Sequence, residues 1–303
     1  MFTLNVLSAT RTIEKTMPFM LYRLLLCLGL GLTILLATLI SAGTIIAFAS
    51  FAKNPSALAG VGAGLGFIAS VYGAYRLRPV WFKTLSLSHL ALLADQIRQK
   101  DIPEGTAQIG YAGLRVTASL PSGSELRLLD ERIKACLEDI MRIHPPLVLT
   151  HPVAQKGVNL LAGGLFASLH HTVLAWHFYS DGSNAWPSAR TALTCLAEHH
   201  KKILLNRLFM SVFEGLGFIA AFWLMLYPTA WVADSLPVAV GLWQYVFAAV
   251  FAWGLKMAFL EPISEATLME GILPNILAVQ EQATLLTAES EAFRRMLEPD
   301  HTE

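Results

Sequence analysis

Two ionisable residues lie within apolar segments of the chain. Glu214 stands near the start of the run Leu208–Tyr227, and Lys256 near the end of the run Val238–Leu260. If the runs are antiparallel membrane helices, a rise of 1.5 Å per residue puts both charges at a similar depth, roughly 6 to 9 Å from one membrane boundary. Charges there are costly and usually face the protein interior. We expect the two to meet, as a structural ion pair with a snorkelling lysine or as a charged element at the inner mouth of a substrate or ion path.

Three carboxylates follow Lys256 along the chain. Glu261, Glu265 and Glu270 are spaced by four and five residues, which spreads them over only part of a helix surface. The spacing is typical of a solvated cytoplasmic helix, and it also fits an acidic vestibule that collects cations below Lys256.

Histidines are frequent, and a metal site would need them at three- or four-residue spacing on a helix. The nearest pair on one face, His170 and His177, is two turns apart. We therefore expect interfacial or hydrogen-bonded histidines and no metal site.

No catalytic constellation is recognisable. The chain has no Gly-x-Ser-x-Gly elbow and no His-Glu-x-x-His pair, and Cys27, Cys136 and Cys195 are too far apart in sequence for a zinc motif. The cysteines are interpreted as small apolar core residues. We expect no enzyme and no bound cofactor.

The composition indicates the environment in which these residues must be positioned. Of 303 residues, 54% are hydrophobic and 15% charged, and the mean hydropathy is +0.52. Soluble domains average about 25% charged residues, so the bilayer is the expected partner. Equal numbers of basic and acidic residues, 22 each, give no general field that would attract nucleic acid.

Four segments are long and apolar enough to cross the membrane, since a span needs about 20 such residues. They are Leu24–Phe51, Pro55–Tyr75, Leu208–Tyr227 and Val238–Leu260. Short connections join them in pairs, which predicts two transmembrane helical hairpins in an all-α polytopic protein.

The second span carries four alternating glycines. Gly60 with Gly64 and Gly62 with Gly66 form two overlapping small-xxx-small motifs. Such motifs let a neighbouring backbone approach closely, so a helix-packing face is predicted. The neighbour is either the other helix of its own hairpin or another subunit.

Lysine and arginine residues predict the orientation, because cytoplasmic loops hold an excess of both. With both hairpin tips outside, Lys53 is the one basic residue beyond the membrane. Both termini and the region 76–207 are then cytoplasmic, in a protein of the cell inner membrane.

The segment 157–179 is also uncharged, but a full crossing would put Arg190 and the basic residues after it outside. On a single helix, Asn159, His170 and His177 would share a polar stripe. We predict an interfacial or re-entrant helix, with this stripe towards the protein and a leucine-rich face towards lipid.

Further amphipathic runs between the hairpins predict interfacial or cytoplasmic helices, and no stretch alternates as a strand does. The expected organisation has four parts. These are an N-terminal segment with the first hairpin (1–83), a helical region (84–207), the second hairpin (208–260) and a C-terminal helix and tail (261–303).

The run Trp186-Pro187-Ser188-Ala189-Arg190-Thr191-Ala192 precedes Glu198, Asn206, Arg207 and two spans, and Lys256-Met257 and Glu261 follow. Residues 185–275 thereby resemble the C-terminal part of choline transporter-like proteins, although Lys256 stands where that family tends to have an acid. The family has more spans than this chain, so the resemblance implies no substrate.

Two functions fit these features. One is an oligomeric transporter or channel-like unit of the inner membrane, because four spans alone make a small bundle. The other is a non-transporting scaffold or regulator that binds a partner through its cytoplasmic helices.

Overall fold

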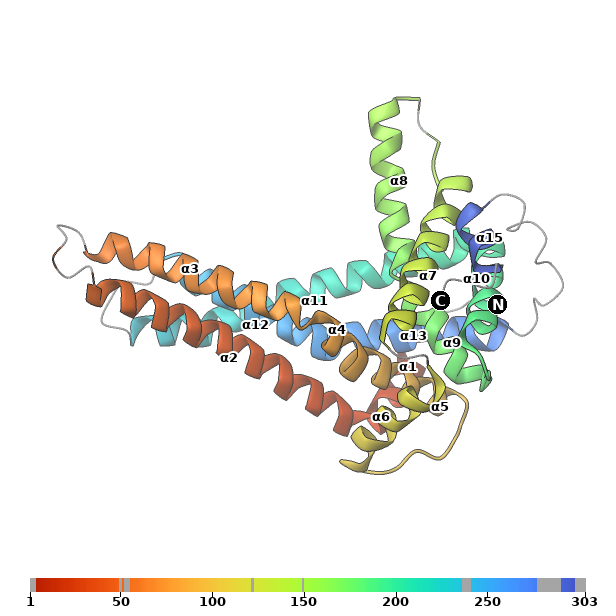
Figure 1. Ribbon diagram of the computed structural model, residues 1–303, viewed down its shortest axis with the longest axis horizontal. Helices are drawn as coiled ribbons and strands as arrows, with labels where there is room; N and C mark the ends of the chain where they lie inside the picture. Colours follow the sequence, from red (N-terminus) through yellow and green to blue (C-terminus); the bar gives the residue numbers. More distant parts are fainter. Residues whose placement is uncertain are drawn as a thin grey trace. The chain divides into compact units, whose positions relative to one another are not determined.

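All regular secondary structure in the described part of the chain is helical (Figure 1). The computed structural model describes residues 4–48, 51, 55–120, 123–148, 150–235, 241–276 and 290–297. The helices are α1 (Val6–Lys15), α2 (Met17–Phe48), α3 (Pro55–Arg76), α4 (Arg78–Trp81), η1 (Phe82–Leu87), α5 (Ser88–Ile97), α6 (Ala107–Ser119), α7 (Gly123–Ile143), α8 (Pro152–Ala167), α9 (His170–Ser180), α10 (Ala185–Glu198), α11 (His200–Asp234), α12 (Trp243–Leu255), η2 (Lys256–Leu260), α13 (Glu261–Ile276) and α15 (Glu291–Leu297). The elements η1 and η2 are π-helical.

The chain divides into two compact units. The hairpin unit comprises Phe19–Leu85 and Phe213–Pro262, and the helical unit comprises Met1–Pro18, Ser86–Val212 and Ile263–Glu303. The helical unit is thus built from three separate stretches of chain. The sequence predicted the middle stretch (84–207) and the C-terminal stretch (261–303) as two separate parts and placed the N-terminal stretch with the first hairpin (1–83).

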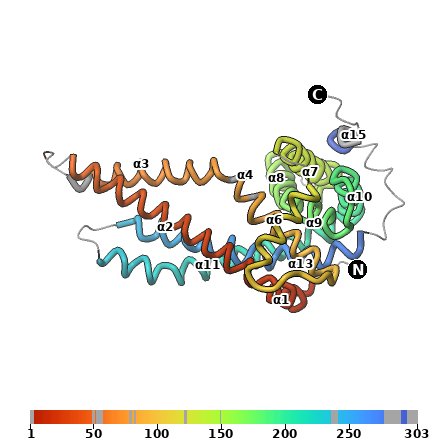
Figure 2. The backbone as a smooth tube through the Cα atoms, turned by 60° about the horizontal axis from the view of Figure 1, so that its bottom comes forward, coloured from red at the N-terminus to blue at the C-terminus, as the bar shows by residue number. Residues whose placement is uncertain are grey.

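In the hairpin unit, α2, α3, α11 and α12 run lengthwise beside one another (Figures 1 and 2). A Cβ added to Gly31 would lie 2.8 Å from the Phe251 ring, and one added to Gly254 would lie 3.5 Å from Cys27 Cβ. Residue 27 of α2 thus lies near residue 254 of α12, and residue 31 near residue 251. The two helices are therefore antiparallel and closely packed.

Five helical segments are long and apolar enough to cross a membrane, judged by length and composition. They are Met17–Phe48, Leu58–Arg76, Pro152–Ser180, His200–Asp234 and Trp243–Ile276. In His200–Asp234 only 11% of the most apolar window is buried within the protein. Long apolar helices with outward-facing apolar side chains indicate a helical membrane protein.

The helical unit is organised around α9. Seven consecutive residues of this helix, Thr172 to Phe178, are buried, and α9 packs against α5 and α10. Around them, α6 packs on α5 and α8 on α7. Seven consecutive residues cover every side of a helix, so α9 is buried all round and its neighbours supply the cover.

The segment 157–179 differs from the single helix that the sequence predicted. It is divided between α8 and α9, and Ser168 and Leu169 between them have ψ angles of −14° and 0°. On the predicted lipid-facing side, Leu161 is exposed but Leu169 and Val173 are buried within the helical unit. The prediction of a leucine-rich lipid face along the whole segment is wrong, because the break changes the register and α9 is covered by other helices.

Candidate functional site

The hairpin unit contains a buried ion pair. Lys256 Nζ lies 2.8 Å from Glu214 Oε2, and the side chains are 19% and 8% exposed. The ammonium group also lies over the Trp253 ring, 5.5 Å from its centroid. Glu214 and Lys256 therefore meet, as their positions in the two spans predicted.

A second ion pair adjoins it. Arg23 of α2 is 2% exposed and lies 3.4 Å from Glu261 Oε2. Its Nη2 also donates a hydrogen bond of 2.8 Å to the backbone carbonyl of Met257, the residue after Lys256. The hydrogen bond to Met257 links the two ion pairs along the chain, and we call Arg23, Glu214, Lys256 and Glu261 together the charge cluster.

The backbone between Lys256 and Glu261 explains how Arg23 is held. In the π-helix η2 the N–H of Glu261 donates to the carbonyl of Lys256, so it is directed away from Met257. The next residue is Pro262, which has no N–H. The carbonyl of Met257 lacks these two helical donors, and the Arg23 guanidinium supplies one instead.

The charge cluster is a functional candidate for two physical reasons. Arg23 and Glu214 are buried, and their partners Glu261 and Lys256 are only 29% and 19% exposed. Burying charges is costly, and apolar residues of similar volume often stabilise a protein as well or better. Single π-helical turns within α-helices are also frequent at functional sites. Stability alone does not account for the four charges.

The three carboxylates predicted as an acidic vestibule have separate surroundings. Glu261 faces Arg23 in the hairpin unit. In the helical unit, Glu265 contacts His171 Nδ1, and Glu270 accepts a hydrogen bond from Thr12. The spacing placed them on part of one helix, and in the structure each carboxylate has its partner on a different element, on α2, α9 and α1.

The predicted polar stripe is likewise dispersed. Asn159 Oδ1 accepts from Gln155 on its own helix, His170 Nε2 lies 3.6 Å from Asp130 Oδ1, and His177 Nε2 donates to the carbonyl of Ser119 at 2.7 Å. The break between α8 and α9 removes the common face on which the stripe depended.

The glycines of α3 fall into two sets. A Cβ on Gly66 would lie 2.8 Å from the carbonyl oxygen of Ala37, and one on Gly62 would lie 2.8 Å from that of Ser41. Among the described residues, a Cβ on Gly60 or Gly64 would meet nothing within 4 Å. The packing neighbour of Gly62 and Gly66 is therefore α2 of the same hairpin.

The helical unit holds a charge network that sequence reasoning missed. Asp181 accepts from Lys100 Nζ at 2.7 Å and from Arg98 and Arg115. Arg115 Nε also lies 3.2 Å from Asp95 Oδ2, and Asp95 is fully buried. Two acids thus fix three cations where α5, α6 and α9 meet.

Titration in this network follows its hydrogen bonds. Partial burial raises the pKa of Asp181, but hydrogen bonds from Lys100 and Arg115, with their charges, lower it more, and the resulting pKa is about 2. Burial raises the pKa of the Tyr111 hydroxyl, which donates to Asp95. At neutral pH Asp181 is therefore ionised and Tyr111 protonated.

Cys27, Cys136 and Cys195 are buried, and none of them forms a disulfide within the described part of the chain. Burial, with a smaller contribution from a nearby carboxylate, raises the pKa of Cys136 and of Cys195 to about 12. Both stay protonated at neutral pH and make poor nucleophiles. In the described part of the chain, no group of three or more His, Cys, Asp or Glu residues could hold a metal ion.

Comparison of the chain with family models, curated proteins and solved structures found no match. The resemblance of residues 185–275 to choline transporter-like proteins stays a prediction.

Proposed function

We propose that the chain is a four-span protein of the cell inner membrane, with both termini cytoplasmic, that works as an oligomeric transporter or channel-like unit. The observation that carries the proposal is the charge cluster of Arg23, Glu214, Lys256 and Glu261. Ionisable groups within apolar helices commonly mark substrate or ion paths.

The charge cluster could act as a gate because its two ion pairs join different helices and can be broken by a competing charge. Each ion pair consists of one cation and one anion from different helices, so a charged solute or a proton that binds one partner competes with the other. Release of Lys256 from Glu214 removes an ion pair between η2 and α11. Release of Arg23 from Glu261 removes one that fixes α2. Such competition couples binding to helix movement.

The burial of α9 supports four spans over five. Its residues Thr172 to Phe178 are covered by helices of its own unit. In addition, a crossing by Pro152–Ser180 would carry the basic residues after Arg190 across the membrane.

Transport is tested with the purified full chain in liposomes. Charge movement and internal pH are recorded after jumps of sodium, potassium, amino acids, organic acids or small amines. The double variant Glu214→Gln/Lys256→Met should reduce any flux at least about tenfold, and the lipid-facing control Leu216→Ala, 63% exposed, should not. Equal flux in the double variant and the wild type would exclude the cluster as a gate. Absence of any flux in the wild type would favour the second function.

That second function is a non-transporting scaffold or regulator, and an exposed apolar face on α8 favours it. Val153, Leu160 and Leu161 are 70%, 78% and 70% exposed. Cysteines at 160 or 161 should then cross-link to a second copy or a membrane partner, whereas one at Leu114 on α6, 72% exposed, should not.

A further inference from the structure

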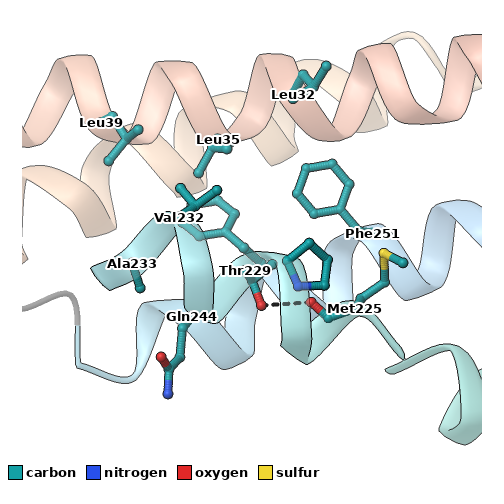
Figure 3. A pocket seen from close by; sticks show the side chains of 11 residues that line it. Leu32, Leu35, Leu39, Met225, Thr229, Val232, Ala233, Gln244 and Phe251 are labelled. Atoms are coloured by element: carbon teal, nitrogen blue, oxygen red, sulfur yellow. Dashed lines mark hydrogen bonds between the residues drawn. The ribbon is translucent and has the colours of Figure 1, made fainter. Parts of the chain in front are cut away.

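The hairpin unit contains an apolar cavity, open on one side, that shares no residue with the charge cluster. Its volume is about 220 Å³, and α2, α11 and α12 contribute its walls (Figure 3). The lining residues that matter for the argument are Leu32, Leu35, Leu39, Thr229, Gln244 and Phe251.

The described lining holds only two polar side chains, and neither offers a polar ligand a hydrogen-bond donor from within the cavity. The Thr229 hydroxyl donates to the carbonyl of Met225 at 2.8 Å, a bond drawn in Figure 3. The amide of Gln244 points away from the α2 leucines. A polar solute would leave most of its hydrogen bonds unmade in this cavity, so the lining favours a hydrocarbon ligand.

Water does not suit the cavity either. A buried water needs two to four polar partners, and apolar cavities of about 150 Å³ stay dry and take up benzene instead. This cavity is larger, and an empty space of that size would forfeit many dispersion contacts along its walls.

The cavity is continuous with the surface that faces lipid. Leu32 lines it and is 50% exposed. On the same helices, Tyr227 and Trp231 of α11 and Tyr245 of α12 are 85%, 71% and 47% exposed. Exposed tyrosine and tryptophan near helix ends are typical of the headgroup level, and a lipid anchored there has acyl chains that reach the adjoining cavity.

We propose that the cavity binds one acyl chain of a membrane phospholipid, which enters sideways from the leaflet at the hairpin tips. Pro228 lines the cavity within α11. As it has no N–H, it leaves one helical hydrogen bond unmade, which loosens the helix at the cavity wall. The proposal is independent of transport, because the site requires only that the hairpins lie in a bilayer.

The test uses a photoactivatable phospholipid whose diazirine lies in the acyl chain, incorporated into liposomes with the full chain. Labelled residues are mapped by mass spectrometry. In the wild type, labelling should concentrate on residues of the cavity lining. Leu35→Trp fills the cavity and should reduce labelling of the remaining lining about tenfold. Leu36→Trp, at a neighbouring position 56% exposed, is the matched control and should leave labelling unchanged.

A second filling variant, Ala233→Leu, guards against misfolding of Leu35→Trp, because it fills the cavity from a different helix, α11, and with an aliphatic side chain. The proposal is overturned if labelling in the wild type spreads evenly over the apolar surface, or if folded Ala233→Leu is labelled as strongly as the wild type.

Discussion

The Glu214–Lys256 ion pair gives a prediction whose size follows from its geometry. At the observed separation of 2.8 Å, the gross attraction is about 6 kcal/mol for an effective dielectric constant of about 20. Desolvation offsets much of it. Removing one partner of a fully buried pair costs about 3 to 5 kcal/mol, and we expect a smaller cost here because the lysine is 19% exposed.

The two single variants should differ. Lys256→Met leaves Glu214, the more buried partner, without the lysine charge and should lower the unfolding free energy by about 2.5 kcal/mol. Glu214→Gln leaves a lysine that is 19% exposed and free to snorkel, so we expect about 1.5 kcal/mol. The double variant should lose only about 1 kcal/mol, which gives a coupling of about 3 kcal/mol.

Unfolding of the purified chain by SDS in mixed micelles, followed by circular dichroism, measures these values. The control is the same double-mutant cycle at Arg127 and Glu131 on α7. Arg127 Nε lies 2.8 Å from Glu131 Oε1, and the two side chains are 80% and 58% exposed. We expect a coupling of at most about 0.5 kcal/mol there. If the Glu214–Lys256 coupling is no larger than that of the control, the pair is not held in a buried, water-poor environment and the reasoning fails.

Cysteine labelling from outside should reach sites near Lys53 and Asp234 and miss sites near Arg127 and Arg190, because basic residues remain cytoplasmic; labelling at Arg190 would require a fifth crossing. Gly66→Ala should destabilise the hairpin unit by roughly 1 to 3 kcal/mol in SDS unfolding, because the new Cβ would meet the Ala37 carbonyl at 2.8 Å, and Gly64→Ala should change it by less than about 0.5 kcal/mol. Asp181→Asn should weaken the helical unit at neutral pH by roughly 1 kcal/mol or less. Since folding lowers the pKa of Asp181 from 3.8 to about 2, its contribution is complete above pH 3.8 and is lost as the pH falls through 2. Acid unfolding curves of variant and wild type that stay apart below pH 2 would contradict this assignment.

The charge cluster shows how far sequence reasoning reaches. The rise of 1.5 Å per residue gives the depth of each residue in a membrane helix, so the pairing of Glu214 with Lys256 could be predicted from the sequence alone. Arg23 could not be assigned, because an arginine before an apolar run has the pattern of an ordinary cytoplasmic flank. Its burial depends on the carbonyl of Met257, which has no helical N–H donor because of η2 and Pro262 and therefore accepts from Arg23.

The helical unit was harder to predict. The break at Ser168 and Leu169 carries no proline or glycine, and α9 is covered by α5 and α10 from other parts of the chain. The motif of Gly60 to Gly66 was recognisable, but only packing geometry distinguishes Gly62 and Gly66 from the other two. The position after α9 did contain a readable signal, since Asp181-Gly182 is typical of a helix end, and Asp181 adopts a positive φ of 51°.

The interleaving of the two units has a consequence for biogenesis. The helical unit draws on α1, on the region from α5 to the start of α11, and on α13 and α15. Ser290 Oγ, for example, donates to Asp139 Oδ2 at 3.1 Å. During synthesis α13 and α15 emerge after the second hairpin, so the helical unit cannot close before that hairpin has been made. A chain stalled at insertion would expose the incomplete surfaces of α7 and α10, where chaperones and quality-control proteases recognise unfinished proteins.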